Sequence, residues 1–367
     1  IGWCDWSSDV CSSDLELNVA FFGSELVYVL ALGVWLLGTA AGALGALPRW
    51  RWPWRVRSAQ LGAPSDEPPD EPSPASIARL FLAAGLLLVA AVAWARAARR
   101  LLGGVPGAFL PFPVQIFAMA LALLPVSFAL GLLFQWTARR AVGGGRTLAA
   151  AYALESAGAL AGGATATLLL RLGLPNLTAV LLCGLVTVLA ARPRAWAART
   201  WGVALLAGLA LTPGLDRLTT GWLHSGLRTV RDTPYGRVVL TVWDGQVNSF
   251  VNDALAYETG GTTAEEFVTL AALQHPAPRR ILVLGGGPAG LAREALRHQP
   301  EQVTSVELDG LHQRLLLAQL PDSLRAPLAD PRVRLATGDP RRLLAKRDGS
   351  DGLGAGWDLI LVGMPEP

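Results

Sequence analysis

Long apolar runs dominate the first 215 residues of the chain. Crossing a bilayer as a helix takes about 20 mostly apolar residues. Five runs meet or approach that length: Leu26–Leu47, Ile77–Ala95, Val114–Phe134, Leu148–Leu170 and Leu177–Ala191. A sixth run, Trp201–Leu215, is shorter and contains Pro213. We expect that run to be interfacial or re-entrant. The pattern predicts a helical membrane domain of five to six spans over residues 16–215, with the lipid bilayer as its partner.

Small residues recur within these runs at the spacing of one helix face. Gly38, Gly42 and Ala46 form one such series, and Gly158 and Gly162 form another. Small side chains let helix backbones approach closely in lipid. The runs are therefore expected to pack into a bundle.

Arginines between the runs indicate orientation. Alternate connections hold ten arginines against four. The ten are Arg49, Arg51, Arg55, Arg57, Arg139, Arg140, Arg146, Arg192, Arg194 and Arg199; the four are Arg96, Arg99, Arg100 and Arg171. Because basic loops stay in the cytoplasm, five spans would place the C-terminal domain in the cytoplasm of a multi-pass inner-membrane protein.

The pattern changes to short alternating runs after Arg231. Arg237–Val242 and Val247–Val251 are typical of strands, and Asp244-Gly245 between them is a hairpin signal. Thr263–Gln274 is expected to be a helix. The sequence therefore predicts a small β-hairpin region ahead of the next domain.

A nucleotide-binding βαβ pattern follows. Ile281–Leu284 predicts a buried strand, Leu291–His298 a helix, and Val303–Val306 a second strand that ends on Glu307. Glycines between the first strand and the helix permit a tight turn close to a ligand, and an acid after the second strand can bind ribose hydroxyls. The glycines are Gly285, Gly286, Gly287 and Gly290. Further strands are expected at Val333–Ala336, before Gly338-Asp339, and at Trp357–Val362.

Composition supports a membrane protein. Of 367 residues, 52% are hydrophobic and 16% charged, whereas soluble proteins have about 25% charged residues. The net charge of +3 gives no basic patch for nucleic acid. Residues 1–15 resemble a translated sequencing adapter, so we treat them as an artefact and expect a fragment open at both ends. Without them Cys183 stands alone, and no metal site is predicted.

The remaining polar residues that stand out are given mainly structural roles. Glu155 lies inside the fourth apolar run, where a carboxylate is a functional candidate or a polar contact between helices. The proline-rich acidic segment 64–75 predicts a solvated linker. His275 and His298 have no partner at metal-ligand spacing, and Asp309 and Asp330 are expected to cap turns.

Residues 231–367 resemble the spermidine synthase (aminopropyltransferase) family, in particular its membrane-fused bacterial branch. The motifs occur in order: Tyr235-Gly236, Asp244-Gly245, Glu265 and Glu266, His275-Pro276, the glycine loop, Glu307, Asp330-Pro331, Gly338-Asp339 and the closing WDLILVGMPEP. The resemblance implies an α/β Rossmann-like domain of the S-adenosylmethionine-binding type over residues 216–367, truncated at its C-terminus. It also implies aminopropyl transfer to an amine.

The resemblance assigns ligands and roles to individual residues. No tightly bound cofactor is implied; decarboxylated S-adenosylmethionine or S-adenosylmethionine would be the co-substrate. Gly285, Gly286, Gly287 and Gly290 would form the loop, Glu307 would bind the ribose and Asp339 would lie beside the adenine. The expected partners are this adenosine-type molecule and a polyamine, and self-association is left open.

Two positions depart from the family pattern. Pro288 stands where the family has the Asp that holds the aminopropyl ammonium, and Gly363 replaces the catalytic Asp. Glu366 is then the remaining candidate catalytic residue. Two alternatives stay open: a different S-adenosylmethionine-dependent transferase, and a non-catalytic nucleotide- or polyamine-sensing domain on a transporter-like bundle.

Overall fold

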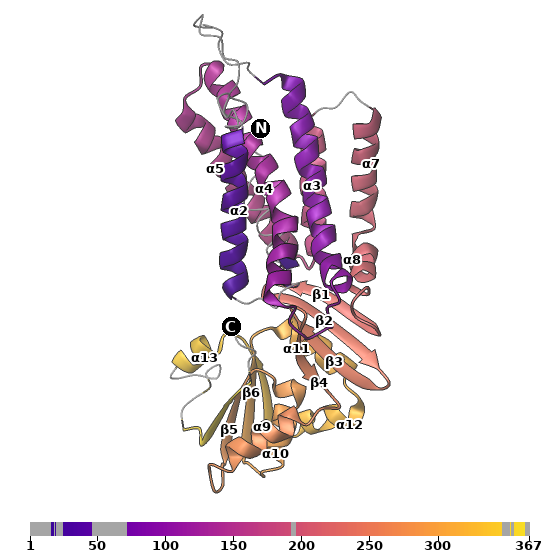
Figure 1. Ribbon diagram of the computed structural model, residues 1–367. Coiled ribbons are helices and arrows are strands. Elements are labelled where there is room, and N and C mark those ends of the chain that lie inside the picture. The colour runs from indigo at the N-terminus through magenta and orange to yellow at the C-terminus, as the bar shows by residue number, and fades with distance from the viewer. Residues whose placement is uncertain are drawn as a thin grey trace, which may run out of the picture. The chain divides into compact units, whose positions relative to one another are not determined.

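A computed structural model describes residues 16–17, 19, 25–45, 72–191, 196–346, 353 and 356–363 (Figure 1). The chain divides into two compact units. The helical unit comprises Ile1–Gly104 and Leu110–Thr219, and the sheet unit comprises Val105–Phe109 and Thr220–Pro367. The suspected artefact, most of the acidic linker and Glu366 lie outside the described residues.

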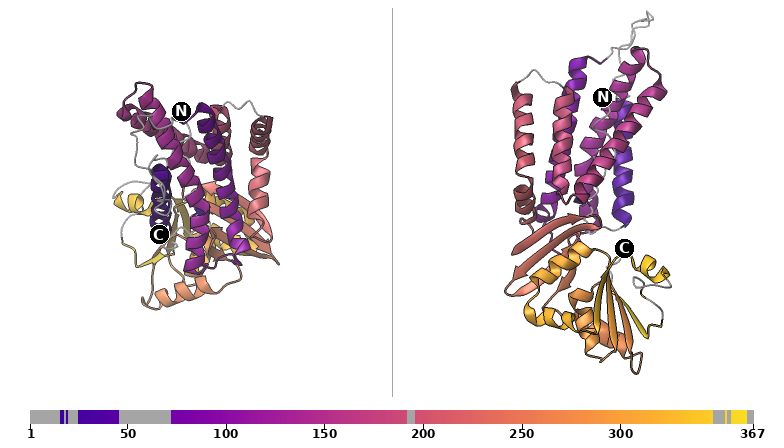
Figure 2. Two further views of the ribbon diagram at one scale, coloured as in Figure 1. Left: turned by 45° about the horizontal axis from the view of Figure 1, so that its top comes forward. Right: turned by 180° about the vertical axis from the view of Figure 1, so that it is seen from behind.

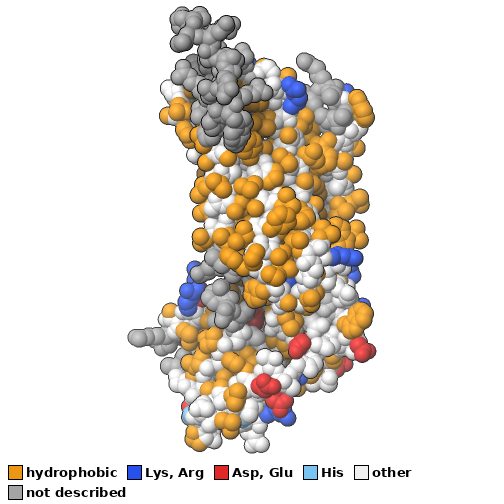
Figure 3. Space-filling model, viewed as in Figure 1, with side chains coloured by type: hydrophobic (Ala, Val, Ile, Leu, Met, Phe, Trp, Pro, Cys, Tyr) orange, Lys and Arg blue, Asp and Glu red, His pale blue; other side chains and the backbone are white. Residues whose placement is uncertain are grey.

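Every predicted apolar run forms a helix. The helices are α2 (Glu25–Gly45), α3 (Pro74–Leu101), α4 (Phe112–Gly143), α5 (Leu148–Arg171), α6 (Asn176–Ala191), α7 (Trp196–Ala210) and α8 (Thr212–Thr220). Within the described residues, four are long and apolar enough to cross a membrane: Val27–Gly45 of α2, α3, α4 and α5. Hydrophobic side chains cover most of the face of this unit shown in Figure 3.

Four helices take up arginines assigned to loops, among them Arg171 at the end of α5 and Arg199 in α7. Arg99 and Arg100 lie in the last turn of α3, and Arg140 lies in the last turn of α4. Arg96 is buried in α3, where its guanidinium contacts Glu16 at 2.6 Å and Asp216 of α8 at 2.8 Å. These long side chains extend the helices because their apolar stems can remain in the bundle.

The sixth apolar run is not one continuous segment. A turn at Leu211 separates α7 from α8, and Pro213 occupies the first turn of α8. Proline is tolerated there because the first helical amides have no partner within the helix. The proline therefore begins a second helix in place of ending the run.

The small-residue series on α2 is a packing surface, as predicted. Helix α4 packs against α2 and α3, α3 packs against α6, and α6 packs against α7 (Figure 2). A Cβ on Gly42 would lie 2.1 Å from the Phe128 carbonyl oxygen, and one on Gly131 would lie 2.2 Å from that of Thr39. Only glycine permits the backbones of α2 and α4 to come this close.

The sheet unit begins with a four-stranded antiparallel sheet, larger than the predicted hairpin. Its strands are β1 (Leu227–Thr233), β2 (Gly236–Trp243), β3 (Gln246–Val251) and β4 (Ala254–Glu258), in that order. The hairpin at Asp244-Gly245 is confirmed, with φ of 47° and 80°. A second turn of the same kind, Asn252-Asp253, joins β3 to β4 with φ of 48° and 67°.

A parallel sheet follows in the order β7-β6-β5-β8. Its strands are β5 (Arg280–Leu284), β6 (Gln302–Glu307), β7 (Val333–Thr337) and β8 (Leu359–Val362), which confirms all four predicted strands. The helical segments of this unit are α9 (Thr263–Ala272), η2 (Gly287–Leu291), α10 (Ala292–Leu296), α11 (Gly310–Gln319), α12 (Asp322–Arg325), η3 (Ala326–Ala329) and α13 (Pro340–Ala345). This sheet is the Rossmann-like part of the chain.

The two sheets share one core. Leu240 of β2 belongs to the same buried cluster as Val268 of α9 and Ile281 and Val283 of β5. Helix α11 lies against β2, and Asp309 caps its N-terminus by accepting hydrogen bonds from the amides of Leu311 and His312. The antiparallel sheet is thus an integral part of this unit.

We expect Gly42→Ala to lower the thermal unfolding midpoint of the full chain in detergent, because the added methyl group would meet the backbone of α4. Overpacking of this kind costs about 1–3 kcal/mol. Gly33→Ala is the matched control, since no atom lies within 4 Å of its Cβ position. That variant should be neutral or stabilised by up to about 1 kcal/mol through helix propensity. Equal midpoints for the two variants would contradict the close packing of α2 on α4.

Candidate active site

The candidate residues gather along one edge of the parallel sheet. Strands β5, β6, β7 and β8 run in the same direction, so their carboxyl ends lie together. Gly285 follows β5, Glu307 ends β6, Asp339 follows β7 by two residues and Gly363 follows β8. In open α/β sheets this edge is where ligands bind.

The glycine loop requires glycine for both conformation and space. Gly285 and Gly286 have φ of 77° and 69°, in the left-handed region that disfavours a side chain. A Cβ on Gly287 would lie 1.7 Å from the Ser305 hydroxyl oxygen of β6. The Gly285 amide also donates to the Val306 carbonyl at 2.8 Å. The loop therefore crosses directly over β6.

The helix after the loop differs from the prediction. A π-helical turn, η2, takes up Gly287–Leu291, and α10 then runs only over Ala292–Leu296. Gly290 has φ of 120°, which interrupts regular helical geometry. The predicted helix over Leu291–His298 is thus shortened, and a ligand here would meet loop amides in place of a long helix N-terminus.

Glu307 faces the loop from the end of β6. Its Oε2 accepts a hydrogen bond from the Gly286 amide at 3.3 Å. Burial raises the pKa of this carboxyl, while hydrogen bonds from the amides of Gly286, Leu308 and Asp309 oppose that rise. An ionised carboxylate accepts hydrogen bonds only, so Glu307 is suited to ligand hydroxyl groups.

Asp339 is held beside Glu307 through the backbone. The Gly338 amide donates to the Glu307 carbonyl oxygen at 2.9 Å. The Asp339 Oδ1 accepts from the Arg341 amide at 2.9 Å and so caps α13. The ends of β6 and β7 thereby present two carboxylates on one edge.

The opposite end of the site has no carboxylate at residues 288 and 363, the two positions where the family pattern has one. Pro288 is buried in η2. The Gly363 amide donates to the Leu284 carbonyl, and a Cβ at Gly363 would lie 2.3 Å from the Leu291 Cδ1. Glu366 lies outside the described residues. Asp358 is at the other edge, where its Oδ2 accepts from the amides of Arg279 and Arg280, as expected for a strand-edge residue.

The comparison with protein families agrees with this geometry. Residues 262–362 match the model of the spermine/spermidine synthase domain. This part of the chain is therefore similar to spermine and spermidine synthases. The match includes the glycine loop, Glu307 and Asp339, and it ends before Gly363.

Polyamine aminopropyltransferases are among the curated relatives of this chain. A polyamine aminopropyltransferase of Synechococcus sp. (strain JA-3-3Ab) is 34% identical over 29% of this chain and 36% of its own length. Another, from Leptospira interrogans, is 30% identical over 37% of this chain and 27% of its own length. The chain thus spans about a third of the length of these curated relatives. A spermidine synthase structure from Thermotoga maritima gives 19% identity and a TM-score of 0.33 over 37% of this chain and 47% of that one, too low to carry an argument.

Sequence reasoning missed one aromatic neighbour of the synthase-like loop. Tyr257 of β4 is half-buried, and its Cε2 is 3.6 Å from the Cβ position of Gly290. Burial raises the pKa of its hydroxyl. The Asn252-Asp253 turn could have revealed β4, and hence this tyrosine, since such dipeptides favour two-residue hairpins.

A second missed contact joins helix α11 to strand β3. His312 Nε2 on α11 lies 2.8 Å from the Ser249 hydroxyl of β3, and Asp309 is close by. The three residue types match a nucleophilic triad, but Ser249 is fully buried and the Asp309 Oδ1 caps backbone amides. The contact therefore holds α11 against β3 and performs no catalysis.

Metal ligation has no support in the part of the chain that the structure describes. Among those residues no group of three or more histidine, cysteine or acidic side chains could hold a metal ion. The carboxylates of the site face a backbone loop, and their geometry suits a hydroxyl-bearing ligand.

We expect the sheet unit to lose stability as pH falls below 6.5, the ordinary pKa of histidine, because burial lowers the pKa of His312 in the folded chain. The unfolded chain then binds a proton that the folded chain does not, which favours unfolding. Pulse proteolysis in urea at pH 5.5 and 7.5 measures the difference. His312→Gln should reduce it, whereas His298→Gln, a partly buried control, should leave it unchanged. The same pH difference in His312→Gln as in the parent would rule His312 out as its source.

Proposed function

We propose that the sheet unit binds decarboxylated S-adenosylmethionine and transfers its aminopropyl group to an amine, as part of a membrane-anchored protein. The observation that carries this proposal is the hydrogen bond between the Gly286 amide and Glu307, which joins glycine loop and acid at one sheet edge. The similarity of residues 262–362 to spermine and spermidine synthases supports the reaction class. The polyamine aminopropyltransferase names of the relatives suggest a polyamine as acceptor.

The proposed reaction requires different groups at the two ends of the site. A neutral amine nitrogen attacks the methylene carbon beside the donor sulfonium, the carbon–sulfur bond breaks, and methylthioadenosine leaves. The amine loses one proton to a base. Glu307 would accept hydrogen bonds from the ribose hydroxyls, and Asp339 would lie beside the adenine. Glu366 remains our candidate for the acid near the amine.

Crowding at Gly363 also supports a second candidate function. Leu291 occupies the space that a side chain on residue 363 would need, and Pro288 offers no carboxylate. A site with these features binds the adenosine part of a donor more readily than the aminopropyl ammonium. Methyl transfer from S-adenosylmethionine, or ligand sensing without a reaction, would then take the place of aminopropyl transfer.

Calorimetry on the purified chain should show binding of decarboxylated S-adenosylmethionine or methylthioadenosine. Glu307→Gln should weaken binding by about 1–3 kcal/mol, the cost of losing a hydrogen-bond partner in a buried site. Because burial raises the pKa of Glu307, protonation at low pH should weaken binding in the parent and not in Glu307→Gln. Glu301→Gln is the matched control, an exposed acid that pairs with Arg279.

The products that form distinguish the three candidate functions. With putrescine and the decarboxylated donor present, methylthioadenosine release supports aminopropyl transfer. S-adenosylhomocysteine formed from S-adenosylmethionine supports methyl transfer, and binding without either product supports sensing. Absence of binding to any of these ligands would contradict all three functions.

We further propose that α7 crosses the membrane. The segment Val105–Phe109 connects α3 to α4 and yet belongs to the sheet unit, where the Gly107 amide donates to the Asp253 carbonyl. If α4, α5 and α6 each cross, three crossings separate this segment from α7. A fourth crossing by α7 returns the chain to the sheet unit at Thr220, in place of the interfacial position expected from sequence.

We infer the side of the membrane on which the sheet unit lies from where its donor molecule is made. With α7 crossing, the ten-arginine connections lie opposite the sheet unit, so the arginine bias alone would put that unit outside. We place it in the cytoplasm because adenosine-type donors are made there.

Reporter fusions test both statements. Fusions after Gly145 and after His224 should report opposite sides, with a fluorescent cytoplasmic reporter active after His224. Reporters on the same side would show that α7 does not cross. Periplasmic phosphatase activity after His224 would move the sheet unit outside and contradict a cytoplasmic donor.

A further inference from the structure

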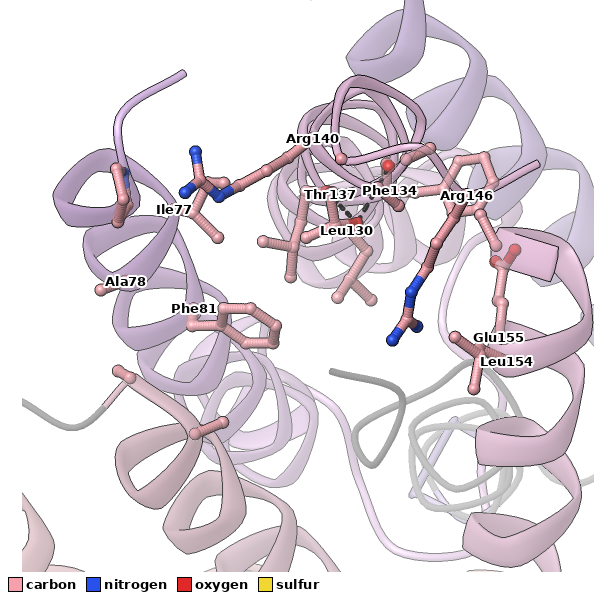
Figure 4. Close-up of a pocket in the computed structure, with 18 residues that line it drawn as sticks. Ile77, Ala78, Phe81, Leu130, Phe134, Thr137, Arg140, Arg146, Leu154 and Glu155 are labelled. Atoms are coloured by element: carbon pink, nitrogen blue, oxygen red, sulfur yellow. Dashed lines mark hydrogen bonds between the residues drawn. The ribbon is translucent and has the colours of Figure 1, made fainter. Parts of the chain in front are cut away.

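A cavity of about 680 Å³ opens at one end of the helical unit. It lies where α3 and α5 begin and where α4 and α6 end, with Pro74, Arg140, Arg146 and Ala191 among its lining residues (Figure 4). All of its lining residues belong to the helical unit. The cavity is therefore separate from the candidate active site.

The inner wall of this cavity is apolar. Phe81 of α3 faces Leu130 of α4 across it (Figure 4). Leu133 and Phe134 of α4 and Leu154 of α5 also line it. The Thr137 hydroxyl bonds back to the carbonyls of Leu133 and Phe134, so it offers little polarity. A wall of this kind suits a hydrocarbon chain.

Two arginines mark the mouth of the cavity. Arg140 is in the last turn of α4, and Arg146 directly precedes α5. Within the described residues neither guanidinium has a hydrogen bond or an ion pair. In Figure 4 Arg146 extends between Leu130 and Leu154, and Arg140 extends toward Ile77. Two cationic groups thus border an apolar space from opposite sides.

The start of α5 adds to this positive character. Thr147 caps the helix by accepting from the Ala150 amide at 3.2 Å, and α5 continues for 24 residues. Free amides in a first helical turn favour a nearby anion. Arg146 and the α5 terminus therefore act on the same region.

Glu155 also lines the cavity, two turns into α5. In Figure 4 its carboxylate and the Arg146 guanidinium point in different directions. Two arginines and one glutamate leave a single positive charge, which matches one phosphodiester. A cationic polyamine would meet repulsion from both guanidinium groups.

We propose that this cavity binds one anionic phospholipid, with its phosphodiester between Arg140 and Arg146 and an acyl chain against Phe81 and Phe134. Basic pockets between membrane helices bind lipid headgroups by this combination. The proposal rests on the membrane placement of α3–α6 and not on any chemistry at Glu307.

The test uses the full chain, delipidated in detergent, with dioleoylphosphatidylglycerol as the probe. Thermal midpoint and native mass spectrometry report stabilisation and stoichiometry. The lipid should raise the midpoint and bind once at high affinity. Dioleoylglycerol, which lacks the phosphate, and glycerol phosphate, which lacks the chains, should each do neither at the same concentration.

Different variants test the contacts to the lipid headgroup and the contacts to its acyl chain. Arg140→Gln with Arg146→Gln should weaken lipid binding at least tenfold, while Arg171→Gln, at the far end of α5, should not. Ala78→Phe should also weaken it by filling the apolar space, without touching either arginine. The midpoint without lipid should match the parent in each variant, which shows that folding is intact.

Equal lipid affinity in the arginine variants and the parent would overturn the proposal, as would an equal shift with glycerol phosphate. Donor binding is measured separately on the same preparation. Lipid binding without donor binding would sustain this site and refute the proposed function. Donor binding without lipid binding would support the proposed function and refute the lipid site.

Discussion

Parallel pairing of β5 with β6 is the constraint on which the sheet unit depends. It brings the ends of the two strands level, so the glycine loop leaves β5 directly over the last residues of β6. Gly287 approaches Ser305, and the Gly286 amide reaches Glu307, because of this register. A shift of one residue would turn Glu307 to the other face of the sheet.

The same register explains why the two ends of the site differ. On the β6 side, backbone hydrogen bonds hold Glu307 and Gly338 together, which preserves an acidic edge for hydroxyl groups. On the β8 side, Gly363 packs under Leu291, so the space is occupied by a hydrocarbon side chain. Charge and packing therefore make the β6 end of this edge polar and the β8 end apolar.

A comparable division organises the helical unit. Glycines bring α2 and α4 into backbone contact, which makes that pair rigid. Where α4 ends and α5 begins, larger side chains and a change of direction leave a cavity in place of a close seam. Arg140 and Arg146 lie at that end, at the end of α4 and just before α5.

Local patterns in the sequence determined most of the elements. Apolar run length predicted the helices, and short strand-like runs on either side of a turn signal predicted strands such as β2 and β3. The Asp244-Gly245 turn and the glycine loop were also predictable, because their backbone angles depend on the residues themselves. Long-range contacts were not. The Ser249–His312 bond joins residues 63 positions apart, and Leu291 reaches Gly363 only because β5 and β8 pair. Which face of α4 meets α2, and which end stays open around Arg140 and Arg146, was likewise decided by packing in three dimensions, since no local pattern specifies a neighbour across the fold.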